Sequence, residues 1–278
     1  MRKKLLFFFA ALLSFIGIQS AKAQHDYVDL GLPSGTLWAT CNVGANAPEE
    51  YGKYFAWGEI EDKSNYTWDS YLYCYQFNYD PLIKKYCNNS RYGKDQYTDD
   101  LTELQPMDDV ATALWGGGWQ MPSASQFEEL INSDYTTVEV AVKNYVGGCK
   151  ITSKINGNSI FLPFAGGYQN SSSIDYVKYN GFYWSRSLSL ADCRRAHLFS
   201  AGQGGSYEVM KTIRCHGYSV RPVRNPVAYV ISNIPDGWQV NGTTTTGSYE
   251  VAKGGSVVFT PVNIPAGKKI KSVKVIKE

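Results

Sequence analysis

The chain has 278 residues, and its 27 basic and 25 acidic side chains give a net charge of +2. So small a basic excess argues against a nucleic-acid-binding protein, because such proteins concentrate positive charge in one patch. The length suits one large domain or two unequal ones, and after residue 23 no stretch is long and apolar enough for a membrane-spanning helix.

The first residues have the order of features found in a secretory signal peptide. Basic residues at positions 2–4 precede an apolar run over 5–18, and Ala21 and Ala23 form the Ala-x-Ala pattern that signal peptidase recognises. We therefore expect residues 1–23 to be a signal peptide, and the mature protein to be secreted, either extracellular or in the cell envelope. Loss of the four basic residues in that segment leaves 23 basic and 25 acidic side chains, a net charge of −2.

The main domain, residues 24–225, begins with predicted short strands. Tyr27–Leu30 and Thr36–Thr40 have strand composition, and the Leu-Pro-Ser-Gly sequence at 32–35 supplies the turn between them. The aromatic stretch EEYGKYFAWGE at 49–59 is predicted to be a further strand.

A tyrosine-rich segment, YTWDSYLYCYQFNYD, follows at 66–80. Alternate residues of an extended chain share a face, so the rings at positions 71, 73, 75, 77 and 79 would form a row that can stack on sugar rings. We favour packing of these rings on the domain, since tyrosine combines burial with an outward hydroxyl, and keep ligand binding as the alternative. The candidate ligand-binding residues are Trp68, Tyr71, Tyr73, Tyr75 and Tyr79.

Two short helices are expected on either side of a glycine run. Acids at 108–109 suit a helix N-terminus, the glycines at 116–118 end that helix, and Trp115 and Trp119 are expected to pack at the corner. A phosphate-binding loop is excluded because neither GxxxxGK[ST] nor GxGxxG occurs. The second helix is expected to begin at Ser123, with Gln126 at capping-box spacing.

The rest of the main domain is rich in predicted strands. The Asn156-Gly157 pair between apolar stretches is a strong hairpin signal, and a second hairpin is expected with its tip at 203–205. The expected later strands are 181–187, 194–201, 207–214 and 218–223.

Six cysteines in an exported chain are able to form disulfides, although spacing alone does not decide their pairing. One pair brackets the tyrosine-rich loop, and another flanks the hairpin with its tip at 203–205. The expected pairs are Cys74–Cys87, Cys193–Cys215 and, by elimination, Cys41–Cys149.

Metal sites are alternatives to these interpretations. Zinc needs a tetrahedral Cys/His set, and calcium needs oxygen ligands, but no CxxC motif and no EF-hand pattern occurs. We therefore expect no metal or other cofactor, and keep calcium as the alternative. The zinc candidates are Cys193, His197, Cys215 and His216, and the calcium candidates are Asp95, Asp99, Asp100, Asp108 and Asp109.

Residues 226–278 are expected to form a small all-β module. Pro222 and Pro226 interrupt strand pairing before it, and short strands separated by turn residues follow, from VAYVISNI at 227–234 to IKSVKVIK at 270–277. About fifty residues bury little surface, so we interpret this module as a spacer. The predicted fold class is therefore α+β, with two short helices plus antiparallel sheets followed by the β module.

The main domain contains a series of motifs in a fixed order. They are VDLGLPSGTLWATCNVGA, YGKYFAWGE, KYCNNSRYGKD, DDVATALWGGGWQMPSASQFEEL, NGNSIFLPFAGGY, YWSRS and GYSVRPV. In this order they resemble the Fibrobacter-type major paralogous domain (FISUMP) family. The resemblance covers residues 26–224, with Ser123 where the family often has Thr and Phe164 at a usually small position. It implies a secreted or surface protein of the Bacteroidetes and a C-type-lectin-like scaffold, which formylglycine-generating enzymes also use.

The function that these observations favour is a non-enzymatic binding or adhesion protein, whose partner is a polysaccharide or another cell-surface component. No GxSxG nucleophile motif occurs, and the calcium-lectin tripeptides Glu-Pro-Asn and Gln-Pro-Asp are absent. The alternatives are a structural envelope protein and a relative of the formylglycine-generating oxidoreductases, although CRRAH and IRCHG do not reproduce the cysteine context of those enzymes.

Overall fold

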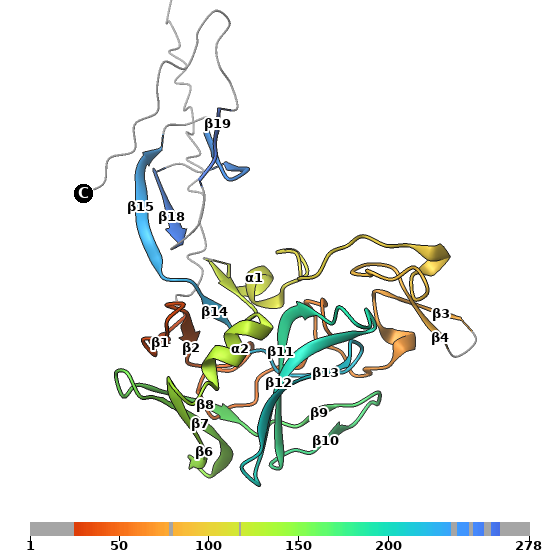
Figure 1. The fold of residues 1–278 in the computed structure, drawn as a ribbon, viewed down its shortest axis with the longest axis horizontal. Coiled ribbons are helices and arrows are strands. Elements are labelled where there is room, and N and C mark those ends of the chain that lie inside the picture. The colour runs from red at the N-terminus through yellow and green to blue at the C-terminus, as the bar shows by residue number, and fades with distance from the viewer. Residues whose placement is uncertain are drawn as a thin grey trace, which may run out of the picture.

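The computed structural model describes residues 25–77, 80–116, 118–234, 238–244, 247–252 and 257–261. The predicted signal peptide, Tyr79 and the predicted last strand at 270–277 lie outside the described residues. The described part consists mostly of antiparallel sheets with two short α helices (Figure 1). The expected combination of two short helices with antiparallel sheets is confirmed.

One sheet joins the beginning, middle and end of the main domain. Its strands, in spatial order, are β1 (Tyr27–Asp29), β2 (Leu37–Ala39), β14 (Val223–Arg224) and β5 (Trp119–Gln120). The turn before β2 is the predicted one, because Gly35 N donates to Leu32 O at 2.8 Å and Gly35 has a φ of 71°. In β14, Val223 pairs with Trp38 on one side and Gln120 on the other.

Two three-stranded antiparallel sheets form the largest β structures of the main domain. Hairpin turns with positive φ connect neighbouring strands: φ is 78° at Gly157, in the predicted turn, and 83° at Gly205, in the predicted tip. A turn not predicted joins β6 to β7 at Asn144 and Tyr145, whose φ values of 47° and 65° suit a two-residue hairpin. The strands are β6 (Thr136–Lys143), β7 (Val146–Ser153) and β8 (Ser159–Pro163) in one sheet, and β11 (Asn180–Leu188), β12 (Arg195–Gly202) and β13 (Tyr207–Ile213) in the other.

The remaining strands form small sheets. Those of the C-terminal region pair only with one another among the described residues, and they extend away from the main-domain sheets in Figure 1. The pairs are β3 (Cys74–Phe77) with β4 (Asp80–Ile83), β9 (Gly167–Tyr168) with β10 (Ile174–Asp175) and β15 (Val227–Ile234) with β18 (Gly247–Ala252). The last sheet has β16 (Trp238–Val240) between β17 (Thr243–Thr244) and β19 (Phe259–Pro261).

The first helix, α1 (Val110–Trp115), has the predicted end signals. Asp109 caps it by accepting a hydrogen bond from Thr112 N at 3.0 Å, and Gly116 ends it with a φ of 61°. The rings of Trp115 and Trp119 then meet edge to face at 5.3 Å, as expected.

The second helix, α2 (Ala124–Leu130), has the predicted capping box. Ser123 Oγ accepts from Gln126 N at 3.1 Å, and the Gln126 amide accepts from Ser123 N at 2.9 Å. Its buried residues Phe127 and Leu130 pack in one cluster with Trp38 and Phe199. The helix therefore ties β2 to β12.

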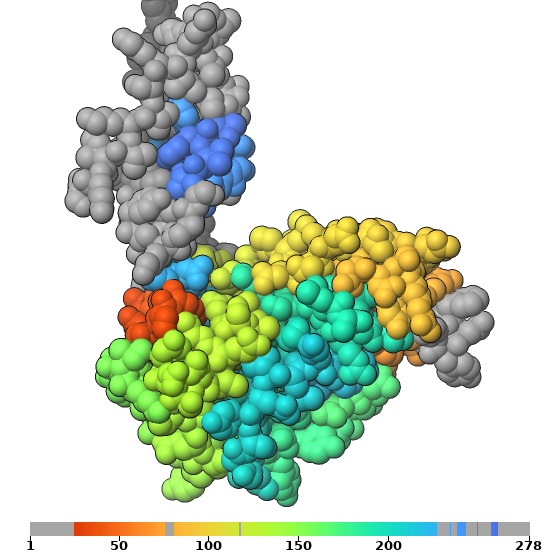
Figure 2. Space-filling view, viewed as in Figure 1, coloured from red at the N-terminus to blue at the C-terminus, as the bar shows by residue number. Residues whose placement is uncertain are grey.

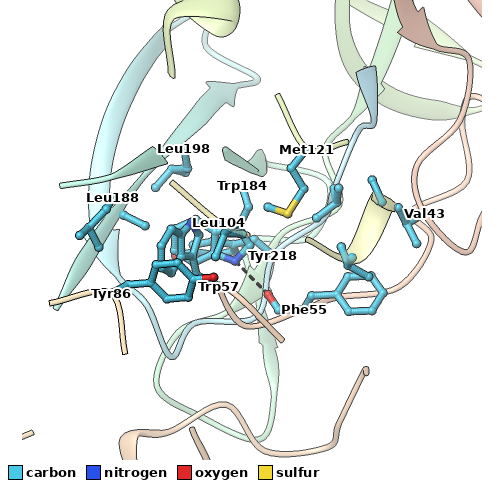
Figure 3. Close-up of a cluster of buried hydrophobic side chains, with 14 of the residues drawn as sticks. Val43, Phe55, Trp57, Tyr86, Leu104, Met121, Trp184, Leu188, Leu198 and Tyr218 are labelled. Atoms are coloured by element: carbon cyan, nitrogen blue, oxygen red, sulfur yellow. Dashed lines mark hydrogen bonds between the residues drawn. The ribbon is translucent and has the colours of Figure 1, made fainter. Parts of the chain in front are cut away.

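A second buried cluster is centred on tryptophans and tyrosines. Trp57, Trp184 and Tyr86 are fully buried, and Tyr218 packs among them (Figure 3). Their polar atoms are satisfied: Trp184 Nε1 donates to Phe55 O at 2.9 Å, and Trp57 Nε1 donates to Ser185 O at 2.8 Å. The cluster also contains Ile83, Cys87 and Leu104, so the loops that follow Trp57 pack on it.

The predicted strand at 49–59 is wrong. Only one isolated antiparallel bridge, between Phe55 and Tyr218, forms there. Gly52 and Gly58 have φ values of 72° and 83°, so the chain turns at both ends of the aromatic stretch and cannot run as one strand.

Candidate functional site

The tyrosine-rich segment does not present one row of rings. A 3₁₀ turn at Trp68–Ser70 lies near its start, and regular strand pairing begins only at Cys74. Tyr71 is 3% exposed, Tyr75 is 46% exposed, and Leu72 is exposed between the tyrosines. The predicted single face is therefore wrong, because the chain is not extended between Trp68 and Cys74.

The candidates at the start of the segment are part of the interior. Tyr71 Oη donates to Trp57 O at 2.6 Å and accepts from Arg214 Nε at 2.9 Å. Trp68 is half-buried and packs edge to face on Tyr71 at 5.7 Å, while Tyr73 is half-buried and meets Tyr71 in the same way at 5.9 Å. These rings hold the loop on the core.

The carboxylate of Asp108 accepts hydrogen bonds from two tyrosines of this region and forms an ion pair with a lysine. Tyr73 Oη donates to it at 2.7 Å, Lys85 Nζ forms an ion pair with it at 2.6 Å, and Tyr86 Oη donates a short hydrogen bond. Burial opposes ionisation of Asp108, but the hydrogen bonds from Lys85, Tyr86 and Tyr73 outweigh it and lower the pKa. Burial and the hydrogen bond to this carboxylate raise the pKa of Tyr73 and Tyr86. The arrangement favours a charged carboxylate fixed by neutral phenols.

Arg214 is a structural residue that the sequence did not single out. Its guanidinium is fully buried and lies 4.7 Å from the centre of the Trp57 ring. Besides Tyr71 it donates to the carbonyl oxygens of Lys85 at 3.0 Å, Tyr86 at 3.0 Å and Cys193 at 2.8 Å. It therefore joins the loop that contains Tyr71, Lys85 and Tyr86, called here the tyrosine loop, to the segment before β12.

The exposed part of this region is a small aromatic surface, defined here as Tyr75, Lys94, Asp95 and Tyr97. Lys94 Nζ lies 5.2 Å from the centre of the Tyr75 ring and 2.6 Å from a carboxylate oxygen of Asp95. Tyr97 is 39% exposed. We call these four residues the Tyr75 surface; it lies on and beside β3 and β4, at one end of the molecule in Figure 1. Tyr75 is the predicted site residue that it contains.

Local backbone contacts place the segment that carries Lys94 and Tyr97 beside β4. Gly93 forms a parallel bridge with Ile83 in β4, and β4 pairs with β3 so that Tyr75 faces Leu82. A Cβ at Gly93 would lie 1.8 Å from Tyr97 O, so no larger residue fits there. Glycine at this position lets residues 94–97 fold tightly beside the strand.

The cysteine pairs expected from spacing are not formed in this structure. None of the six cysteines is disulfide-bonded. Cys87 Sγ lies 2.7 Å from Cys193 Sγ, whereas Cys74 packs with Cys215 in a separate cluster. The third expected pair is also not formed: Cys149 is buried in β7, and Cys41 is only partly buried after β2.

The three histidines and two of the calcium candidates are at least partly buried or contact other protein groups. His25 stacks on Trp115 at 3.6 Å, His197 is half-buried in β12, and His216 Nδ1 is 2.9 Å from Tyr218 Oη. Among the calcium candidates, Asp109 caps α1, and Asp99 accepts from the backbone N–H groups of residues 86 and 87. Within the described ranges, no group of three or more Cys, His, Asp or Glu residues could hold a metal.

A groove that the sequence did not indicate lies on the sheet of β6, β7 and β8. It is an open groove of about 410 Å³ lined by the apolar side chains Val28, Val142 and Phe161 and by Lys143 and Lys150. Lys150 forms an ion pair with Glu139 across β6 and β7 at 3.3 Å.

No protein-family model, curated protein or solved structure matches the chain. In the described parts of the chain, no helix has the length and apolarity needed to cross a membrane.

Proposed function

We propose that the chain is a secreted or cell-surface binding or adhesion protein, and that its ligand is a polysaccharide. The proposal includes the signal peptide, a FISUMP-like main domain with a C-type-lectin-like scaffold, and the C-terminal β module as a spacer. The motifs of the main domain and its combination of two short helices with antiparallel sheets support this scaffold.

The observation that carries the proposal is the Tyr75 surface. An exposed tyrosine ring offers an apolar face for the C–H groups of a sugar ring, and a nearby Lys–Asp pair offers hydrogen bonds to its hydroxyls. The hydrogen bonds of Tyr71 to Arg214 and of Tyr73 to Asp108 restrain the segment that precedes Tyr75. A restrained loop loses little conformational entropy when it binds, which favours recognition.

The test is binding to immobilised dextran, mannan and xylan and to a glycan array, with wild type and Tyr75→Ala compared. Loss of one stacked ring costs about 1–3 kcal/mol in comparable platforms, so we expect Tyr75→Ala to weaken binding at least about fivefold. Tyr207→Ala is the matched control, because Tyr207 is 40% exposed in β13, on another sheet. Unchanged binding by Tyr75→Ala would remove the Tyr75 surface from the proposal.

A structural envelope protein is the second candidate. It is favoured by the use of Trp68, Tyr71 and Tyr73 as packing residues rather than as an exposed row. Absence of binding by wild type to every glycan of the array, with the folded state confirmed by circular dichroism, would favour this candidate.

A further inference from the structure

Two cysteines far apart in the sequence meet in the interior. Cys87 and Cys193 are 106 positions apart, both are fully buried, and their sulfur atoms are 2.7 Å apart. The sulfurs of a disulfide are about 2.0 Å apart, so a small movement would join this pair.

The backbone on both sides of the contact is fixed. Arg214 Nη1 donates both to the carbonyl oxygen of Tyr86, next to Cys87, and to the carbonyl oxygen of Cys193. The carboxylate of Asp99 accepts from Tyr86 N at 2.6 Å and from Cys87 N at 2.9 Å. One buried cation and one carboxylate therefore hold the two cysteine-bearing segments in register.

We propose that Cys87 and Cys193 are joined by a disulfide in the oxidised protein. The bond would connect the tyrosine loop to the segment that enters β12. It would link the loop that carries the Tyr75 surface covalently to the β11–β13 sheet. The proposal depends on neither the ligand nor the route of export.

The reaction requires a disulfide donor, such as a thiol–disulfide oxidoreductase or oxidised glutathione. The Cys87 thiolate attacks one donor sulfur and releases the other as a thiolate, which leaves a mixed disulfide. Cys193 gives its proton to the released thiolate and attacks the sulfur of Cys87, so that the second donor sulfur leaves and takes a proton from water. The two protein thiols are oxidised, and the donor disulfide is reduced to two thiols. Because both cysteines are fully buried, we place this exchange before the loop closes over them.

The two thiols have different pKa values in the folded contact. The hydrogen bond between the two sulfurs, followed by a backbone hydrogen bond at Asn89 and the charge of Arg214, lowers the pKa of Cys87 to about 7 against the effect of burial. The same hydrogen bond, together with burial, raises the pKa of Cys193. In the folded contact Cys87 is therefore the more acidic of the two thiols.

Peptide mapping tests the bond directly. The full chain is refolded in reduced and oxidised glutathione, alkylated under denaturing conditions and digested with trypsin without reduction. We expect YCNNSR, residues 86–91, linked to SLSLADCR, residues 187–194. Recovery of either cysteine in alkylated form, or of YCNNSR linked to the peptide 64–84 that contains Cys74, would overturn the proposal.

Variants provide a second readout. Wild type should lose about 5 to 15 °C of melting temperature when dithiothreitol is added. Cys87→Ser and Cys193→Ser should each leave the partner cysteine alkylated and show no such loss. Cys41→Ser is the control, because Cys41 is outside this contact, and it should keep both the linked peptide and the sensitivity to dithiothreitol. A wild-type melting temperature unaffected by dithiothreitol would contradict the proposal even if the variants did not fold.

Discussion

At the scale of single residues, buried cations organise the loops of this protein. Arg214 bonds three carbonyl oxygens and one hydroxyl, and the fully buried Arg221 donates to Ala39 O, Thr40 O and Phe161 O and to the side chain of Asn42. A planar guanidinium can satisfy several acceptors in one plane, so each arginine joins chain segments that are distant in sequence. Neither role was predictable, because the acceptors are backbone atoms whose positions only the fold defines.

His216 provides a test at this scale. It is 9% exposed, and burial, followed by the charge of Arg195, lowers its pKa to about 4. In the unfolded chain the pKa is near 6.5, so between pH 6.5 and 4 the unfolded state takes up a proton that the native state does not. The free energy of unfolding should therefore fall as the pH falls through this window, by up to about 3 kcal/mol.

Urea denaturation of wild type and His216→Asn at pH 7 and pH 4.5 measures this effect. Asn can still accept a hydrogen bond from Tyr218 but does not titrate, so its stability should fall less with pH than that of wild type. Equal pH dependence of the two proteins would show that the buried imidazole does not cause it.

At the scale of elements, local signals predicted turns and helix ends well. The Ser123–Gln126 capping box, the glycine end of α1, the Asn156-Gly157 turn and the 203–205 tip all depend on residues a few positions apart. The strand β6 was missed although TTVEVAVK alternates β-branched residues with others. The neighbours of the cysteines and the orientation of Tyr71 could not be predicted, because they depend on contacts between distant segments.

The α2 cap is tested by Ser123→Ala. The variant removes the acceptor for Gln126 N and should destabilise the protein by about 1 kcal/mol in urea unfolding. Ser123→Thr retains an acceptor oxygen and should stay within a few tenths of a kcal/mol of wild type. If Ser123→Ala and Ser123→Thr were equally stable, the side-chain cap would not contribute to the start of α2.

At the scale of the molecule, the sheets form a scaffold to which the loop region is attached. The sheets β6–β8 and β11–β13 and the tryptophan cluster form the scaffold. Arg214 fixes the described residues between 66 and 108 to it, and Asp108 joins Tyr73 to Tyr86 within that region. The sequence predicted the two short helices and the tyrosine-rich segment from local patterns. The identity of the exposed ring was not predictable, because Tyr71, Tyr73 and Tyr75 have the same local pattern and very different surroundings.

Binding of ligand at the Tyr75 surface is tested by hydrogen–deuterium exchange, measured by mass spectrometry, with and without the array polysaccharide that wild type binds most tightly. We expect the ligand to slow exchange at the backbone amides of residues 72–77 and 80–97 and to leave exchange in the β6–β8 groove unchanged. Protection confined to the groove lined by Val142 and Phe161, or no protection at a saturating concentration, would contradict the claim that the Tyr75 surface binds the ligand.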